Sequence, residues 1–341
     1  MMHNKSMQLS QLMPLLIHTF KSEHDLIKAI DELSLKFTQK REQISDYLKD
    51  ERLTSAYTAF YLTTNMPKLE AVFKWLPELW VEQFKLSTFI DVGAGPGTFS
   101  LAFREWAGVP VKAMQIETSS VMREQAQKIW AGLYPDEKLL NKAEGQKVLF
   151  FGHSANEMGS EVALRYVKEH DPDHILFIEP GTKDFFPKML EIRRVLLKQG
   201  YNILFPCPTA DECPMKGSET DWCHQFVQVR QESEVERLSQ MVKKDRRNLP
   251  LTVHAFSKTF KSANPTSRVV RILPETKFSY EWETCELNHL EHYQIMKRGL
   301  NKMALNSLSE ALAGAAMEVE LEKEVEKKKR VKILTLNKLP L

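Results

Sequence analysis

The chain has 341 residues, which is enough for two domains or for one large domain with additions. Hydrophobic residues make up 43% of it, an ordinary value for a globular protein with a buried core. The 47 basic and 45 acidic residues nearly cancel, so any contact with nucleic acid has to come from local patches. No apolar run approaches the ~20 residues that span a bilayer, and the start lacks the features of a secretory signal. We therefore expect a cytoplasmic protein without membrane contact.

The first 84 residues are predicted to form a helical region, because they contain no glycine and apolar residues recur at helical spacing. From Thr88 onward, short apolar strands alternate with helices, which predicts a parallel α/β sheet covered by helices on both faces. The expected strands are 88–92, 111–116, 147–151, 175–178 and 201–205, and the expected helices are 99–106, 120–131 and 184–198. This alternation places a Rossmann-like core at residues 85–205.

The second half of the chain departs from this rhythm. Residues 206–290 contain a cysteine-bearing loop, an expected helix at 232–244, and two segments, 251–260 and 267–273, that are expected to close the sheet. Residues 291–341 are expected to form a C-terminal helix and a charged tail. The tail contains the basic run from Lys327 to Lys332, preceded by alternating glutamates, so RNA contact and a solvated helix face are equally open interpretations.

A glycine-rich turn, Asp91-Val92-Gly93-Ala94-Gly95-Pro96-Gly97, links the first strand to a helix. Glycines let a ligand approach the backbone where a Cβ would clash, and the acid at the strand end suits a cationic ligand better than a pyrophosphate. Glu117 ends the next strand, where a carboxylate can accept hydrogen bonds from both ribose hydroxyls. The turn resembles the first motif of class I methyltransferases. This resemblance implies that S-adenosylmethionine binds at Asp91, Gly93, Gly95, Gly97 and Glu117.

Two further positions are candidates for the same site. Class I enzymes often carry an acid after the third strand to hold the adenine amine, and this chain has Ser154 and Asn156 there, for which a plain loop role is an equal alternative. After the fourth strand, Glu179-Pro180-Gly181-Thr182 stands where amino-group methyltransferases carry Asn/Asp-Pro-Pro-aromatic. Glu179 is expected to face the cofactor or substrate edge, because ligands bind beyond the carboxyl ends of the strands. No residue is assigned to catalysis.

Four cysteines lie in the second half with the spacing Cys-x5-Cys-x9-Cys-x61-Cys. Four thiolates are enough for a tetrahedral zinc ion or for an iron–sulfur cluster, and the spacing fits the usual pattern of neither. Four unrelated buried thiols are the alternative. Metal binding is favoured because three of the four fall within 17 residues of a Pro-rich loop. The candidate ligands are Cys207, Cys213, Cys223 and Cys285.

The motifs that follow the fourth strand resemble a single family over about residues 50–290. They are Ile178–Thr182, Phe205–Pro208, Cys213-Pro214 and Asp221–His224. They are similar to those of the methyltransferase-like family of the small ribosomal subunit, found in bacteria and mitochondria. The resemblance implies a class I methyltransferase fold, association with the small subunit and its rRNA during assembly, and a 4Fe–4S cluster on the four cysteines. This chain has Thr209 where the family often has histidine.

Three functions are compatible with these features. The first is an rRNA methyltransferase, and the second is an assembly factor that keeps cofactor and cluster for structure and docking. The third is a methyltransferase for another substrate, stapled by zinc. The absence of an Asn-Pro-Pro motif favours the second. Whether the protein is an enzyme is left open, and we expect it to be a monomer.

Overall fold

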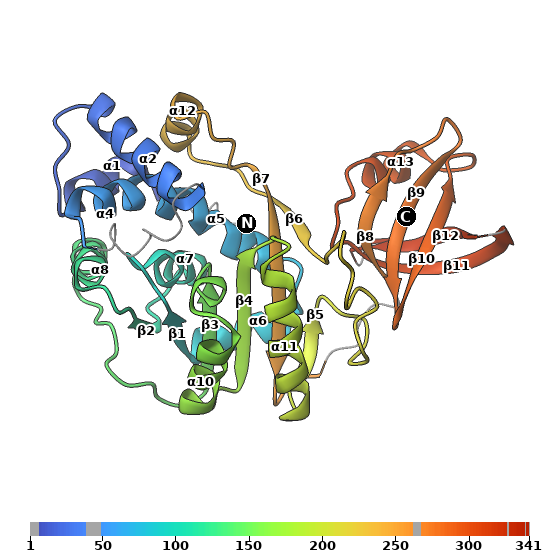
Figure 1. Ribbon diagram of the computed structural model, residues 1–341, viewed down its shortest axis with the longest axis horizontal. Helices are drawn as coiled ribbons and strands as arrows, with labels where there is room; N and C mark the ends of the chain where they lie inside the picture. The colour runs from blue at the N-terminus through green and yellow to red at the C-terminus, as the bar shows by residue number, and fades with distance from the viewer. Residues whose placement is uncertain (1–6, 39–48, 262–266, 326, 338, 341) are drawn as a thin grey trace.

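Two sheets organise the chain in the computed structural model, an α/β sheet and a β-barrel that stands at one end of the molecule (Figure 1). The structure describes residues 7–38, 49–261, 267–325, 327–337 and 339–340. In this part of the chain, none of the helices combines the length and the apolar character that crossing a membrane requires.

Helices precede the first strand, as predicted for the part of residues 1–84 that the structure describes; residues 1–6 and 39–48 lie outside it. Leu26, Ile30 and Leu33 on one helix pack against Leu53 on another in a shared apolar cluster. The π-helical turn η3 interrupts a longer helix, and such turns are frequent at functional sites. These elements are α1 (Leu9–Leu12), η1 (Met13–Leu15), α2 (Glu23–Thr38), α4 (Glu51–Tyr57), η3 (Thr58–Leu62), α5 (Thr63–Phe73), α6 (Glu78–Glu82) and η4 (Gln83–Leu86).

The α/β sheet has the strand order β2-β1-β3-β4-β7-β5, and β6 pairs with the far end of β7. Strand β7 runs antiparallel to both of its main neighbours, so the prediction of a purely parallel sheet is wrong at this one strand. An antiparallel strand inserted second from the edge is the arrangement of a Rossmann-like class I methyltransferase sheet. The strands are β1 (Thr88–Val92), β2 (Lys112–Ile116), β3 (Lys147–Gly152), β4 (His174–Pro180), β5 (Asn202–Phe205), β6 (Gln225–Gln228) and β7 (Asn248–Ser257).

Both faces of this sheet are buried, which explains why its central strands are continuous apolar runs. Phe89 and Phe150 point into the core on one face, whereas their neighbours Ile90 and Leu149 point into the core on the other. Helices supply the opposing surfaces. They are α7 (Thr98–Ala107), α8 (Ser120–Leu133), α9 (Ala155–Met158), α10 (Ser160–His170) and α11 (Phe185–Lys198). Helix α12 (Ser233–Met241) packs instead against the N-terminal helices.

The C-terminal part is a closed barrel with the order β10-β9-β8-β11-β12, in which a parallel pairing of β10 with β12 completes the ring. A helix joins the third and fourth strands, so the topology is that of an OB-fold. Trp282, Tyr293, Met317 and Val331 fill the interior. The elements are β8 (Ser267–Leu273), β9 (Ser279–Glu286), β10 (His289–Met296), α13 (Lys302–Ser309), β11 (Ala316–Val325), β12 (Lys328–Leu336) and β13 (Leu339–Pro340).

The barrel corrects the prediction for the end of the chain. Residues 267–273 start the barrel instead of closing the α/β sheet, and the described residues after 291 form strands with one helix between them instead of a C-terminal helix and a charged tail. The basic run is a strand whose alternate residues Val331 and Ile333 face the core. Lys329 and Lys332 face Glu324 and Glu320 across the ladder, whereas Arg330 faces Lys323. These charged side chains mask the period of two in the sequence.

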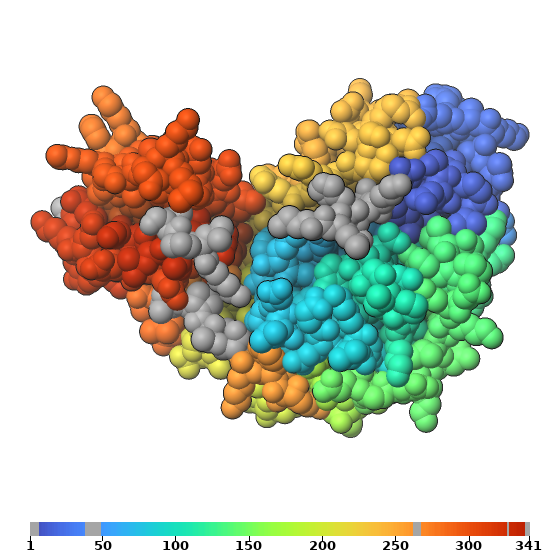
Figure 2. All heavy atoms as spheres, turned by 180° about the vertical axis from the view of Figure 1, so that it is seen from behind, coloured from blue at the N-terminus to red at the C-terminus, as the bar shows by residue number. Residues whose placement is uncertain are grey.

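A groove of about 590 Å³ separates the barrel from the α/β body on the rear face (Figure 2). Its walls come from Trp75 after α5, from Phe226 on β6 and from Met303 on α13. The two domains meet at the groove, where the backbone N–H of Phe226 donates to the carbonyl of Ala313 at 3.1 Å. They also meet at Arg268 of β8, which donates to the carbonyl of Pro206 in the α/β body and to that of Gly314 within the barrel. The guanidinium of Arg268 also stacks over the ring of Phe205, 4.4 Å from its centroid.

Candidate cofactor pocket and cysteine cavity

A pocket of about 390 Å³ opens at the carboxyl ends of β1 and β3. The strand order reverses here, since β2 lies on one side of β1 and β3 on the other, and nucleotide ligands bind at such a switch point. The pocket contains four of the predicted cofactor residues in its lining, namely Gly93, Gly95, Glu117 and Ser154. The structure therefore brings these four residues together at one pocket, and cofactor binding there stays a prediction.

The glycine turn is held in a shape that other residues adopt only with strain. Gly93, Gly95 and Gly97 have φ values of +70°, +56° and +87°. A Cβ on Gly93 would lie 2.5 Å from the Cβ of Ser154, whereas one on Gly95 would meet no protein atom within 4 Å. The backbone N–H of Gly95 donates to the Glu117 carboxylate at 2.8 Å, and that of Ser119 donates to it at 2.9 Å. Glu117 is thus fixed at the pocket by the turn itself.

Asp91 lies beneath the turn, fully buried, and its contacts are with the protein. Its carboxylate accepts hydrogen bonds from the backbone N–H of Ser100 at 3.0 Å and from its hydroxyl at 2.8 Å. Burial raises the pKa of Asp91 to about 7, although the two Ser100 hydrogen bonds favour the charged form. Asp91 therefore secures the first turn of α7, and a direct contact with a cofactor stays a prediction.

Glu179 is also fully buried, and it holds the loop that follows β3. Its carboxylate accepts hydrogen bonds from three consecutive backbone N–H groups, at 3.0 Å from Ser154, 2.8 Å from Ala155 and 3.3 Å from Asn156. Burial raises its pKa to about 8, against the effect of these hydrogen bonds. Glu179 thus supports Ser154, whose hydroxyl donates to the carbonyl of Val92 at 2.6 Å. Contact of either side chain with a cofactor remains a prediction.

The sheet order changes which segment corresponds to the Asn-Pro-Pro position. Because β3, and not β4, lies beside β1, the segment next to the glycine turn is Gly152-His153-Ser154, and it too lacks an Asn-Pro-Pro sequence. His153 has a left-handed backbone with φ +60°, and its ring stacks on Phe99 at 6.0 Å between centroids. Strained backbone of this kind concentrates at functional sites. Sequence reasoning missed His153 because it assigned the comparison to the wrong strand.

Helix α5 brings further polar residues to this pocket that the sequence gave no reason to single out. Asn65 lines the pocket, and its side-chain oxygen accepts a hydrogen bond from Arg246 at 3.2 Å. Lys68, one turn later, is 1% exposed, and its Nζ lies 3.0 Å from Nε2 of His153. Burial, together with Arg246, lowers the pKa of Lys68 well below its ordinary value, and burial and Lys68 do the same for His153. These contacts join residues that lie 85 or more positions apart.

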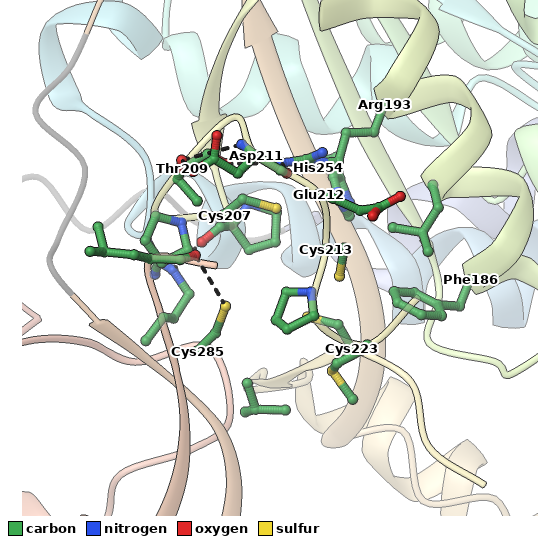
Figure 3. A pocket seen from close by; sticks show the side chains of 18 of the residues that line it. Phe186, Arg193, Cys207, Thr209, Asp211, Glu212, Cys213, Cys223, His254 and Cys285 are labelled. Atoms are coloured by element: carbon green, nitrogen blue, oxygen red, sulfur yellow. Dashed lines mark hydrogen bonds between the residues drawn. The ribbon is translucent and has the colours of Figure 1, made fainter. Parts of the chain in front are cut away.

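The four cysteines surround one cavity between the α/β body and the barrel (Figure 3). Cys207 follows β5, Cys213 and Cys223 lie in the loop before β6, and Cys285 comes from β9 of the barrel. Trp222 packs in the same apolar cluster as Cys213, Cys223 and Cys285, and its indole N–H donates to the carbonyl of Gly181 at 3.0 Å. The predicted grouping of the cysteines is therefore present in the structure, although the residues come from two domains.

The thiols are spaced more widely than a single zinc ion requires. In the described residues, the one set of three ligand atoms that lie within 4.8 Å of one another belongs to Glu286, His289 and Glu291, so no three of the thiols meet this limit. Zn–S bonds of about 2.3 Å in a tetrahedron place sulfurs only about 3.8 Å apart. The set of three is itself held by Lys329, whose Nζ lies 3.1 Å from Glu286 and 3.2 Å from Glu291.

The lining of the cavity suits an anionic group rich in sulfur. Arg268 and Arg193 line it together with the buried imidazole of His254, and in the described structure Nε of Arg193 and Nδ1 of His254 are buried without a partner. Burial and the neighbouring thiols raise the pKa of Cys223, and they raise that of Cys285 to about 12. Burial therefore favours the neutral thiol forms of Cys223 and Cys285 in the absence of a cation.

One comparison with known proteins concerns the segment that contains the cysteines. Residues 154–297 match the family model described as mitochondrial small ribosomal subunit Rsm22. The match covers less than half of the chain, and it includes all four cysteines and the first three strands of the barrel. No curated protein matches the chain.

Several solved methyltransferases resemble the chain at low identity. An O-methyltransferase family protein from Burkholderia thailandensis is 14% identical, with a TM-score of 0.38 over 72% of this chain and 75% of that one. A SAM-dependent methyltransferase from Aquifex aeolicus is 16% identical, with a TM-score of 0.30 over 42% of this chain and 91% of that one. A SAM-dependent methyltransferase from Thiobacillus denitrificans, in complex with S-adenosyl-L-homocysteine, is 12% identical, with a TM-score of 0.27 over 56% of this chain and 95% of that one. The fold class rests on the strand order described above.

Proposed function

We propose that this protein binds S-adenosylmethionine, holds a 4Fe–4S cluster on its four cysteines, and acts in the assembly of the small ribosomal subunit. The observation that carries the proposal is the cysteine cavity, which joins an α/β sheet of the methyltransferase type to an OB-fold barrel. The Rsm22 family model, described as mitochondrial small ribosomal subunit, matches the segment that builds this cavity. Cytoplasmic location and a monomeric state are part of the same proposal.

The glycine turn supports the proposal that a cofactor binds. Gly93, Gly95 and Glu117 line the pocket at the switch point, and Glu117 is positioned by two backbone N–H groups. S-adenosylmethionine supplies an activated methyl group, so transfer needs mainly alignment of an acceptor. The segment at the Asn-Pro-Pro position lacks that motif, which favours an assembly role over rRNA methylation.

The wide spacing of the thiols supports a cluster over zinc. Cys207, Cys213, Cys223 and Cys285 would hold it, and Arg193, Arg268 and His254 provide buried donors around the sulfurs. Its role would be structural, because it links the loop after β5 to a barrel strand. Structural metals stabilise the fold to which their ligands belong.

The barrel supports the proposal that the binding partner includes RNA, because OB-folds bind oligonucleotides through one face and its loops. The loop between β8 and β9 exposes Phe278, which is 66% exposed, with Lys277 over its ring at 5.8 Å. The backbone N–H of Lys297 donates to the carbonyl of Phe278 at 2.8 Å, while the ammonium of Lys297 pairs with Glu275 at 2.9 Å. An exposed aromatic ring beside a cation, here Lys277, is a combination on which single-stranded bases stack.

Anaerobic purification tests the cluster. The protein should be brown, with iron and sulfide near four each per chain. Colourless protein with one zinc per chain would replace the cluster by the zinc-stapled alternative. Cys223→Ser should lose the colour, whereas Glu219→Ser, at an exposed position of the same loop, should keep it as a control.

Co-sedimentation with small ribosomal subunits tests the partner and separates the two roles. Cys223→Ser should abolish association or lower the amount of protein that accumulates, whereas Glu117→Ala should weaken cofactor binding with a milder effect on association. If Glu117→Ala is the more damaging change and a specific rRNA methyl group disappears with it, the protein is a methyltransferase and the assembly role is wrong.

A further inference from the structure

Two buried guanidinium groups line the cysteine cavity, one from each domain. Arg193 of α11 is 5% exposed and Arg268 of β8 is 7% exposed, and Figure 3 shows Arg193 on the cavity wall. An arginine side chain stays protonated in proteins. Burial lowers the pKa of Arg268 to about 10, and the nearby thiols oppose this effect, so it is charged at neutral pH. The cavity wall therefore carries two fixed positive charges.

The described hydrogen bonds of both guanidiniums end on neutral carbonyl oxygens. Nη2 of Arg193 donates to the carbonyl of Thr209 at 2.9 Å and to that of Asp211 at 2.7 Å. These carbonyls belong to the loop between the first two cysteines, so Arg193 holds that loop in place. Arg268 likewise donates to two carbonyls.

The carboxylates in the lining of the cavity lie at exposed positions and have partners of their own. Asp211 accepts a hydrogen bond from the hydroxyl of Thr209 at 2.9 Å, and Glu212 pairs with Lys216. Residues 262–266, which precede β8 and lie outside the described part, contain no ionisable side chain in the sequence. The sulfurs are therefore the buried groups of this cavity that can balance the two guanidiniums.

Two nitrogen atoms on the cavity wall are ready to donate to sulfur. Nε of Arg193 and Nδ1 of His254 are buried without a partner among the residues that the structure describes, and His254 on β7 is 2% exposed. Buried polar groups in native proteins have hydrogen-bond partners, and a thiolate or sulfide at a metal centre accepts such bonds. A neutral imidazole carries its proton on the nitrogen that faces an acceptor, which here is Nδ1.

We propose that Arg193 and His254 donate hydrogen bonds to the sulfurs of the centre and that they raise its reduction potential. The inference rests on the proposed 4Fe–4S cluster and adds what sets its electronic state. An oxidised core carries two positive charges, so four thiolates give the whole group two negative charges, which the two guanidiniums balance. One further electron adds negative charge, which a neighbouring guanidinium and N–H donors stabilise. Arg193 is thus a positioning residue that also acts through its charge.

A redox titration of the anaerobically purified full-length protein, followed by electron paramagnetic resonance, measures this potential. Arg193→Gln removes the charge, and we expect a shift to a more negative potential, of which Arg193→Lys restores most. His254→Phe removes one donor, and we expect a smaller shift in the same direction. Arg194→Gln changes the exposed neighbour on α11 and is the matched control, with the potential of the unmodified protein expected.

A purely structural role would lower the amount of cluster that the variants retain without moving the potential of the protein that keeps it, and this result would overturn the inference. If Arg193→Gln retains no cluster, His254→Phe decides, because it leaves the loop contacts of Arg193 and its charge in place; an unchanged potential there overturns the inference.

The same preparation separates this inference from the proposed cluster. Unmodified protein that is colourless and carries zinc contradicts the cluster, and competition with a chelator then decides the role of Arg193. The zinc affinity of Arg193→Gln should be about ten- to a hundredfold lower than that of the unmodified protein, and equal affinities would overturn the inference. Protein that holds neither iron nor zinc contradicts both proposals.

Discussion

Gly93 and Gly95 share a left-handed backbone but differ in what surrounds them, and this difference decides what a substitution does. Gly93→Ala combines backbone strain with a Cβ 2.5 Å from the Cβ of Ser154, so we expect it to lower the free energy of unfolding by about 2–4 kcal/mol. Gly95→Ala adds backbone strain alone, so we expect it to lower the free energy of unfolding by only about 1 kcal/mol. Its effect on cofactor binding should be larger than its effect on stability. Urea unfolding of the two variants checks this order, and an equal loss in both would contradict it.

Glu179 gives the protein a pH dependence of stability whose sign follows from its burial. Its pKa is about 8 in the folded chain and 4.5 in its ordinary state, so the folded protein binds the proton more tightly. Stability should therefore fall as pH rises from about 4.5 to about 8. Glu179→Gln, which cannot ionise, should flatten the curve in this range, as thermal melts at several pH values would reveal. An unchanged slope would show that Glu179 is not the group responsible.

At the scale of elements, the outer face of the barrel is organised around Glu281. It is nearly buried, and burial opposes its charge, but hydrogen bonds from Ser279, Lys328, Gln294 and His292 outweigh this and lower its pKa to about 2. Because the pKa is lowered, the stability that charged Glu281 and its hydrogen bonds contribute is present above pH 4.5 and is lost as pH falls toward 2. Glu281→Gln should destabilise the barrel by about 1–3 kcal/mol. Glu320→Gln, on exposed β11, is the control, and a comparable loss there would contradict the prediction.

The elements also show what the sequence could and could not predict. The strand 88–92 and the helix at 184–198 were recognisable because apolar periodicity and flanking glycines or prolines mark them, and β1 and α11 fall within a residue of these bounds. The barrel was not recognisable, because Lys and Glu at outward positions of β11 and β12 hide the alternation of Val331 and Ile333. The pairs Lys68–His153 and Asn65–Arg246 carry no local signal at all, since only the fold brings them together.

At the scale of the whole molecule, Arg268 fastens the barrel to the α/β body. It donates to Pro206 and Gly314 and lies over Phe205, and it is almost fully buried. Arg268→Met should lose the hydrogen bonds and leave two carbonyls without their donor, which costs about 2–4 kcal/mol. Urea unfolding would measure the loss of stability, and faster limited proteolysis near residues 258–261 would detect the loosened contact between the domains. An Arg268→Met variant that resists proteolysis as well as the unmodified protein does would show that other contacts hold the two domains together.

The cysteine cavity has a consequence for how the protein is made. A ribosome delivers Cys207, Cys213 and Cys223 well before it delivers Arg268 and Cys285, which complete the lining from the barrel. Strand β7, which lies between β4 and β5, also emerges after the first three thiols. For that interval the nascent chain carries open thiols on an unfinished sheet. We expect these sulfurs to be more open to oxidants until the barrel, which is translated after them, completes the cavity.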